Sequence, residues 1–85
     1  MNAGRPVRVL LFAAAREAAG TGRLEVPHRP GLTAEDIWKR LETDHPALAP
    51  LASTISTAVN HRFTKKATPL DPGDELAFLP PVSGG

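Results

Sequence analysis

A chain of 85 residues supports one domain with a modest core, because a protein of this size buries only about 60 to 65% of its unfolded surface on folding. Hydrophobic residues make up 41% and charged residues 22%, close to the globular average, so the composition gives no reason to expect a disordered chain. A net charge of +1 with interspersed signs gives no field that would favour nucleic acid or an anionic membrane. The sequence has no cysteine, which excludes disulfides, thiolate metal sites and cysteine nucleophiles.

The first strand is predicted at residues 7–13, an almost continuous apolar run of strand formers that is typical of a central strand. Because Arg8 interrupts this stretch, and because it falls far short of the ~18 residues of a membrane span, we expect no membrane segment and a cytoplasmic protein. A single helical turn at 16–19, closed by Gly20, precedes a short edge strand at 23–26 that Pro27 ends.

Thr33 opens a predicted helix, since it stands three residues before Asp36 in the spacing of a capping box. The apolar residues that follow recur at helical intervals and are Ala34, Ile37, Trp38 and Leu41. Charged residues four positions apart, 35 with 39 and 36 with 40, form ion pairs on the solvent side. The helix therefore covers an apolar surface, with Trp38 in the core, and Pro46 ends it. Leu48 and Leu51 continue the core contact.

Three further strands are predicted in the second half of the chain. Residues 55–59 form the first of them, and the polar pair Asn60 and His61 forms a turn. Residues 62–68 form a short, basic, peripheral strand. The segment from Asp71 to Asp74 is a strong turn that contains proline and glycine, and residues 75–79 form the last strand.

The order of these elements, ββαβββ or ββαββ, predicts an α+β domain in which one main helix covers one face of a mixed sheet of four to five strands. Central pairing of the two most apolar strands, 7–13 and 75–79, gives the β-grasp arrangement of ubiquitin-like proteins. We expect this domain to span residues 1–79 and residues 80–85 to form a flexible, extended tail.

The tail consists of Pro80, Pro81, Val82, Ser83, Gly84 and Gly85. The two prolines lack the N–H that a sheet needs and fix φ at about −65°, so they end the last strand and project the chain as a stiff arm. The two glycines remove side-chain bulk, and six extended residues reach about 20 Å. This geometry favours insertion of the terminal carboxylate into a narrow channel of another protein, and a rigid Pro-Pro segment directly after a strand is not what a frayed terminus requires.

Three stretches resemble the small subunit of molybdopterin synthase of the MoaD type: residues 12–17 (Phe-Ala-Ala-Ala-Arg-Glu), Val59-Asn60, and the closing segment from Gly73 to Gly85. The likeness spans nearly the whole chain, and the closing segment is its most specific part. It implies a β-grasp fold and a sulfur-donor role for Gly85. In that family an E1-like enzyme adenylates the terminal glycine with ATP, and a sulfurtransferase or cysteine desulfurase system converts it to a thiocarboxylate. The tail then enters the large subunit and donates sulfur to a cyclic pyranopterin precursor of the molybdenum cofactor.

The resemblance also implies that this chain is not an enzyme on its own and binds no cofactor, because the large subunit holds the pocket in a heterotetramer and the activating partner uses the ATP. The chemistry of the residues agrees with this role. A C-terminal carboxylate, with an ordinary pKa of about 3.5, is ionised at neutral pH and must be activated before a nucleophile can attack it. The chain has no nucleotide motif of its own. In a chain without a thiol, the terminal thiocarboxylate is the available site for transferable sulfur.

Two alternatives stay open at the level of sequence. Sulfur carriers for thiamine or cysteine biosynthesis also end in diglycine on a β-grasp fold, although the double proline is more similar to the molybdopterin synthase group. A conjugated protein modifier would instead join Gly85 to lysines of its targets, so lysine-linked adducts in place of a free thiocarboxylate distinguish the two classes.

Other side chains give weaker signals. The three histidines are scattered without the spacing of metal ligands and are expected on the surface: His28, His45 and His61. The basic cluster Arg62, Lys65 and Lys66 could dock a partner, although basic residues on a peripheral strand commonly prevent edge pairing. The acidic residues between 71 and 75 are explained by turn chemistry rather than by a cation site.

An interface is predicted on the face of the sheet that the helix leaves open, because side chains alternate along a strand and one helix covers only one face. Four residues of the two central strands are assigned to the covered core: Val9, Leu11, Leu76 and Phe78. Their neighbours Phe12 and Leu79 are then exposed on the open face, and Phe63 on the nearby hairpin extends the apolar patch. The resemblance implies that the large subunit docks on these residues.

Overall fold

The computed structural model describes residues 4–81, which form a five-stranded sheet in the order β2-β1-β5-β3-β4. The elements in chain order are β1 (Val7–Leu11), α1 (Ala13–Ala19), β2 (Arg23–Val26), α2 (Ala34–Asp44), the 3-10 helix η1 (Pro46–Leu51), β3 (Ser56–Val59), β4 (Arg62–Thr64) and β5 (Glu75–Leu79). The described part of the chain contains no helix that is long and apolar enough to cross a membrane.

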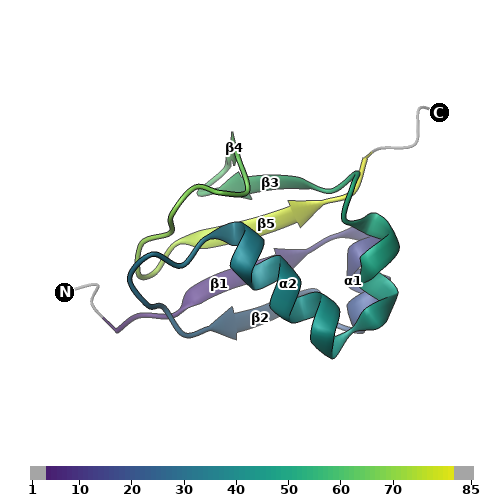
Figure 1. Ribbon diagram of the computed structural model, residues 1–85, viewed down its shortest axis with the longest axis horizontal. Coiled ribbons are helices and arrows are strands. Elements are labelled where there is room, and N and C mark those ends of the chain that lie inside the picture. The colour runs from purple at the N-terminus through teal and green to yellow at the C-terminus, as the bar shows by residue number, and fades with distance from the viewer. Residues whose placement is uncertain (1–3, 82–85) are drawn as a thin grey trace.

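The two central strands come from opposite ends of the chain. β1 and β5 pair in parallel, whereas the other three strand pairs are antiparallel, so β2 and β4 lie at the edges. Helix α2 crosses one face of the sheet, and α1 and η1 lie at the end toward which β1 and β5 run (Figure 1). The predictions of a mixed sheet, of central pairing between the first and last strands and of one main helix on one face are confirmed.

The core lies between α2 and the covered face of the sheet. Val7, Val9 and Leu11 of β1 and Leu76 and Phe78 of β5 are almost wholly buried, as the alternation of side chains predicts. Trp38 of α2 is also buried, and its ring meets that of Phe78 edge-on with the centroids 5.0 Å apart. The indole N–H donates to Oε1 of Glu42 at 2.8 Å, so burial of this ring leaves no unpaired donor.

The predicted capping box begins α2. Thr33 Oγ1 accepts a hydrogen bond from the Asp36 N–H at 3.1 Å, and Asp36 Oδ2 accepts one from the Thr33 N–H at 3.0 Å. Hydrogen bonding of the Asp36 carboxylate by the backbone N–H of Thr33 and by its side chain, assisted by Arg29 and Lys39, lowers the pKa of Asp36 below its ordinary value. The box fixes where α2 starts and therefore where it crosses the sheet.

Some predicted boundaries are wrong. β1 ends at Leu11 rather than at residue 13, because Phe12 caps α1 and Ala13 has a φ of 49°, which turns the chain into a run of good helix formers. α1 therefore starts at Ala13 rather than at residue 16, although it ends as predicted before Gly20, whose φ of 75° is left-handed. η1 was not predicted, because Pro46 indicated only the end of a helix.

The peripheral strand is also shorter than predicted and ends at Thr64 rather than at residue 68. Beyond Thr64 the chain leaves the sheet and bonds instead to the start of α2 and to the loop before it. The Glu35 N–H donates to the Lys66 carbonyl at 2.9 Å, and the Leu70 N–H donates to the Leu32 carbonyl at 2.8 Å. The predicted strand at 55–59 starts one residue later, at Ser56.

Candidate functional site

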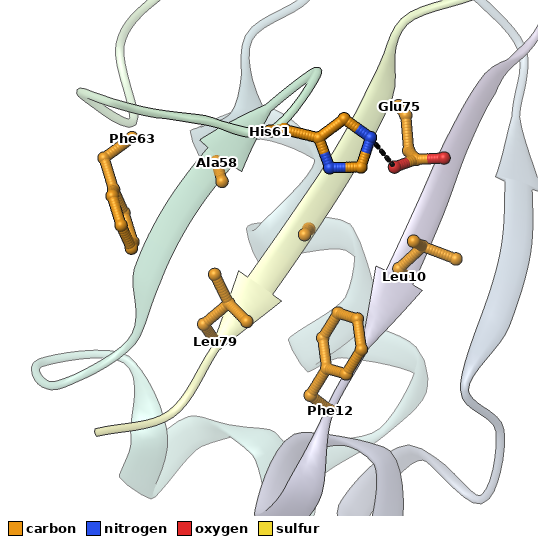
Figure 2. A pocket seen from close by; sticks show the side chains of 8 residues that line it. Leu10, Phe12, Ala58, His61, Phe63, Glu75 and Leu79 are labelled. Carbon is orange, nitrogen blue, oxygen red and sulfur yellow. Dashed lines mark ion pairs between the residues drawn. The ribbon is translucent and has the colours of Figure 1, made fainter. Parts of the chain in front are cut away.

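The candidate site is a hollow on the open face of the sheet, opposite α2. Its eight lining residues are Leu10, Phe12, Ala58, His61, Phe63, Glu75, Ala77 and Leu79, and its volume is about 230 Å³. We call it the apolar hollow. In Figure 2 the labelled side chains of β1, β3 and β5 project from this face toward the viewer. The structure thus brings together all three residues that the sequence predicted for an interface: Phe12, Phe63 and Leu79.

Strand register explains why a hollow forms here. Leu10 lies opposite Ala77, Ala77 opposite Ala58, and Ala58 opposite Phe63, so one row of side chains runs across four strands. The two alanines in the middle of this row are short, whereas the residues around them are large. The result is a depression with an alanine floor and an apolar wall, which fits a protruding apolar side chain of a partner.

Two aromatic rings of this wall are exposed to solvent. Phe63 is 77% exposed and Phe12 is 43% exposed, while Leu79 is partly buried. A two-residue turn at Asn60 and His61, both with positive φ, joins β3 directly to β4 and sets the register that turns Phe63 to the open face. Large exposed aromatic side chains around an apolar depression are typical of a protein interface.

A polar rim closes the hollow at one end. Glu75 Oε1 lies 3.5 Å from Nε2 of His61, and Glu75 Oε2 lies 3.8 Å from a guanidinium nitrogen of Arg8 (Figure 2 draws the first of these pairs). Asn60 holds the adjoining turn, because its amide nitrogen donates to Asp74 Oδ1 at 3.0 Å and its Oδ1 accepts from the Glu75 N–H at 3.0 Å. The rim therefore carries charges that are already partly paired within the chain.

The chain leaves the sheet beside the apolar hollow. Leu79 is both the last residue of β5 and part of the wall, and it is followed by Pro80, which is partly buried, and Pro81, which is exposed. The remaining tail residues, Val82, Ser83, Gly84 and Gly85, lie outside the described residues, so their roles stay predictions. The sequence had indicated Phe12, Phe63 and Leu79, but not the alanine floor or the part of His61 in the rim.

Two of the weaker candidates, Lys66 and His28, form hydrogen bonds within the fold. Lys66 is engaged within the fold, because its Nζ donates to the Ala52 carbonyl at 2.7 Å. His28 is partly buried rather than on the surface, and its Nε2 hydrogen-bonds to the Leu70 carbonyl at 2.7 Å. Within residues 4–81 no group of three or more histidine, cysteine, aspartate or glutamate side chains is placed to hold a metal ion.

The pairing of the first and last strands at the centre of the sheet, with α2 across one face, defines a protein of the ubiquitin-like β-grasp class. The chain belongs to the ThiS family, which it matches over residues 9–85. The molybdopterin synthase sulfur carrier subunit of Homo sapiens is 37% identical over 82 residues, with 93% of each chain covered. That of Escherichia coli strain K12 is 39% identical over 80 residues, covering 93% of this chain and 99% of the relative.

A solved structure adds a second kind of relative. SAMP1 from Haloferax volcanii, whose name abbreviates small archaeal modifier protein 1, superposes with a TM-score of 0.81 at 31% identity and covers 94% of this chain and 99% of its own. Together with the family match, these relatives identify the chain as a ubiquitin-like sulfur-carrier protein.

Proposed function

We propose that this chain carries sulfur as a thiocarboxylate on Gly85 and acts as the sulfur-donor subunit of a molybdopterin synthase in the cytoplasm. The observation that carries the proposal is the junction between β5 and the tail, where a β-grasp strand runs directly into Pro80 and Pro81 beside an apolar hollow. The family match continues through Gly85, and relatives at 37% and 39% identity bear the name of that subunit.

The chemistry takes place on the terminal carboxylate. An E1-like partner transfers AMP from ATP to the Gly85 carboxylate, which releases pyrophosphate and creates a good leaving group. A sulfurtransferase or cysteine desulfurase then presents a persulfide, whose terminal sulfur displaces AMP and forms an acyl disulfide with Gly85. A thiol reduces this S–S bond, is itself oxidised to a disulfide, and releases the thiocarboxylate. The chain has no cysteine to hold that sulfur elsewhere, and we propose that it binds no cofactor itself.

The large subunit of the synthase is the proposed receiver of the tail, in a heterotetramer. We infer that it seats an apolar side chain in the apolar hollow against Phe12, Phe63 and Leu79. The tail leaves β5 at the edge of that hollow, so docking there directs the remaining residues toward the same partner. The large subunit supplies the pyranopterin pocket, and this chain supplies the sulfur.

The test is a synthase assay reconstituted from this chain in its thiocarboxylated form, the large subunit of the same organism and the cyclic pyranopterin precursor. Deletion of Gly85 and the substitution Gly84→Val are both expected to abolish activity with an unchanged melting temperature. The deletion removes the sulfur-bearing carboxyl, and a branched Cβ blocks a narrow channel and forbids positive φ. Wild-type turnover of either variant would contradict the proposal. If the thiocarboxylated chain supports product formation only in an assay of thiamine or cysteine biosynthesis, it is a sulfur carrier of that pathway instead.

A second candidate function is protein modification. It is favoured by the similarity to SAMP1, at 31% identity over nearly the whole chain. In that case the activated Gly85 would acylate a lysine amine of a target, with loss of AMP, and no sulfur would be needed. Lysine-linked adducts that persist when the sulfur source is withheld would support the modifier and count against the carrier.

A further inference from the structure

A second hollow adjoins the apolar hollow on the open face of the sheet. Its volume is about 450 Å³, and it shares Leu10 and Phe12 with the apolar hollow. The rest of its wall comes from Leu11 of β1, from Arg16 of α1, from the loop at residues 21–22 and from Arg23 at the start of β2. We call it the arginine hollow. The two hollows form one continuous surface because they have Leu10 and Phe12 in common.

Local packing holds the two arginines at this surface. The side chain of Arg16 lies over Gly22, where a Cβ would come within 3.2 Å of both its Cδ and its Nε. Thr21 fixes the start of β2, because its hydroxyl donates to the Arg23 carbonyl at 2.9 Å and accepts from the Arg23 N–H at 3.3 Å. The Leu11 N–H donates to the Gly22 carbonyl at 2.9 Å and ties the loop to β1.

Neither arginine of the arginine hollow forms an ion pair within the described part of the chain. Ion pairs among residues 4–81 engage Arg8, Arg29 and Lys39, but none engages Arg16 or Arg23. Both of these arginines are exposed. The strand glutamates that face the same way, at positions 25 and 75, lie in register with Arg8, and together with Arg23 they line a separate hollow beside Leu10.

We propose that the arginine hollow binds a carboxylate side chain of the protein that docks on the apolar hollow, an inference that rests on the proposed function. Arginine presents several N–H donors in a planar fork that matches a carboxylate, and two guanidinium groups around one hollow offer such donors from two sides. Phe12 stands between the two hollows, so the same partner surface reaches both. The partner is therefore expected to carry an acidic side chain beside an apolar one.

The spacing between these two partner side chains follows from the strand register. Arg23 lies opposite Leu10, and Leu10 lies opposite Ala77 on the floor of the apolar hollow. Neighbouring strands are about 4.8 Å apart, so two strand steps separate Arg23 from Ala77 by about 10 Å. The acidic side chain is therefore expected about 10 Å from the apolar side chain that fills the apolar hollow.

The test measures the dissociation constant of the large subunit of the same organism for this chain by titration calorimetry at low and high ionic strength. Arg23→Glu is expected to weaken binding by at least about tenfold at low ionic strength, with the difference shrinking at high ionic strength as salt screens the pair. Arg23→Gln and Arg16→Gln are expected to weaken it less. The matched control is Arg62→Glu, which makes the same charge change at a residue opposite Val59, on the covered side of the sheet. This variant is expected to keep the dissociation constant within about twofold of wild type.

Two results would overturn the inference while leaving the proposed function intact. One is wild-type affinity and salt dependence for a folded Arg23→Glu or Arg23→Gln variant, together with weakened binding of Phe63→Asp. The other is a site for free phosphate, seen as large amide shifts of residues 22 and 23 in an NMR titration of the full chain with inorganic phosphate. Failure of the wild-type chain to bind the large subunit would overturn both the inference and the docking part of the proposed function.

Discussion

The phenylalanines of this chain differ in environment according to which face of the sheet they occupy. Phe78 of β5 is fully buried against Trp38, whereas Phe63 of β4 is 77% exposed on the other face. Phe12 follows β1 and caps α1 on the same open face. Because side chains alternate along a strand, the position of a residue in the alternation decides whether its ring stabilises the fold or is available to a partner.

Replacement of an exposed ring should therefore affect binding and not folding. Phe63→Asp is expected to weaken binding of the large subunit by about 2 kcal/mol, which is about 30-fold, because it introduces a charge into the wall of the apolar hollow. Phe12→Asp should act in the same way, since aspartate is a favourable helix N-cap and α1 would keep its start. Titration calorimetry measures the affinity, and melting temperatures should stay close to wild type.

Replacement of the buried ring, Phe78, should affect folding rather than binding. Phe78→Ala is expected to cost about 3 to 5 kcal/mol of unfolding free energy in a urea titration, because it removes a buried ring from the contact with Trp38. If Phe12→Asp unfolds the protein, or if Phe63→Asp binds as tightly as wild type, the assignment of the open face is wrong.

At the scale of the elements, predictability depends on how local the signal is. The capping box of α2 and the left-handed glycine after α1 could be predicted because each is set by a few neighbouring residues. The helical start at Ala13 could not, because it requires a positive φ at a non-glycine residue. β4 is short because the segment after it bonds to the start of α2 and to the loop before it, and those partners are distant in sequence.

The capping box gives a prediction about pH. The pKa of Asp36 is lowered in the folded state, chiefly by its hydrogen bonds with Thr33, so the carboxylate contributes stability above its unfolded pKa, at about pH 4. This contribution is lost as the pH falls through the lowered folded pKa. The unfolding free energy of wild type relative to Asp36→Asn should therefore be larger near neutral pH than at acidic pH, as measured by urea titration at each pH.

A second variant makes this pH effect specific to the box. When Thr33 is replaced by alanine, the effect of Asp36→Asn on the unfolding free energy should depend less strongly on pH. Some dependence should persist, because the backbone N–H of residue 33 still donates to Asp36. If the unfolding free energy of wild type exceeds that of Asp36→Asn by the same amount at neutral and at acidic pH, the account is contradicted.

At the scale of the whole molecule, a single layer of helices leaves one face of the sheet uncovered, and the site lies on that face (Figure 1, Figure 2). The alternating pattern of β1 and β5 predicted which residues would be exposed there. It could not predict the alanine floor, because the row from Leu10 through Ala77 and Ala58 to Phe63 depends on strand register between distant segments. The arginine hollow could not be predicted for the same reason, since Arg16 of α1 and Arg23 of β2 line one hollow only in the folded chain.

The central claim is that Gly85 carries transferable sulfur, and intact mass spectrometry tests it most directly. After incubation of the full chain with the activating enzyme of its host, ATP and a sulfur source, replacement of one carboxyl oxygen by sulfur should raise the mass by about 16 Da. The increase should be absent when Gly85 is deleted or ATP is omitted. An unchanged mass under activating conditions, or lysine-linked adducts in place of the thiocarboxylate, would contradict the account.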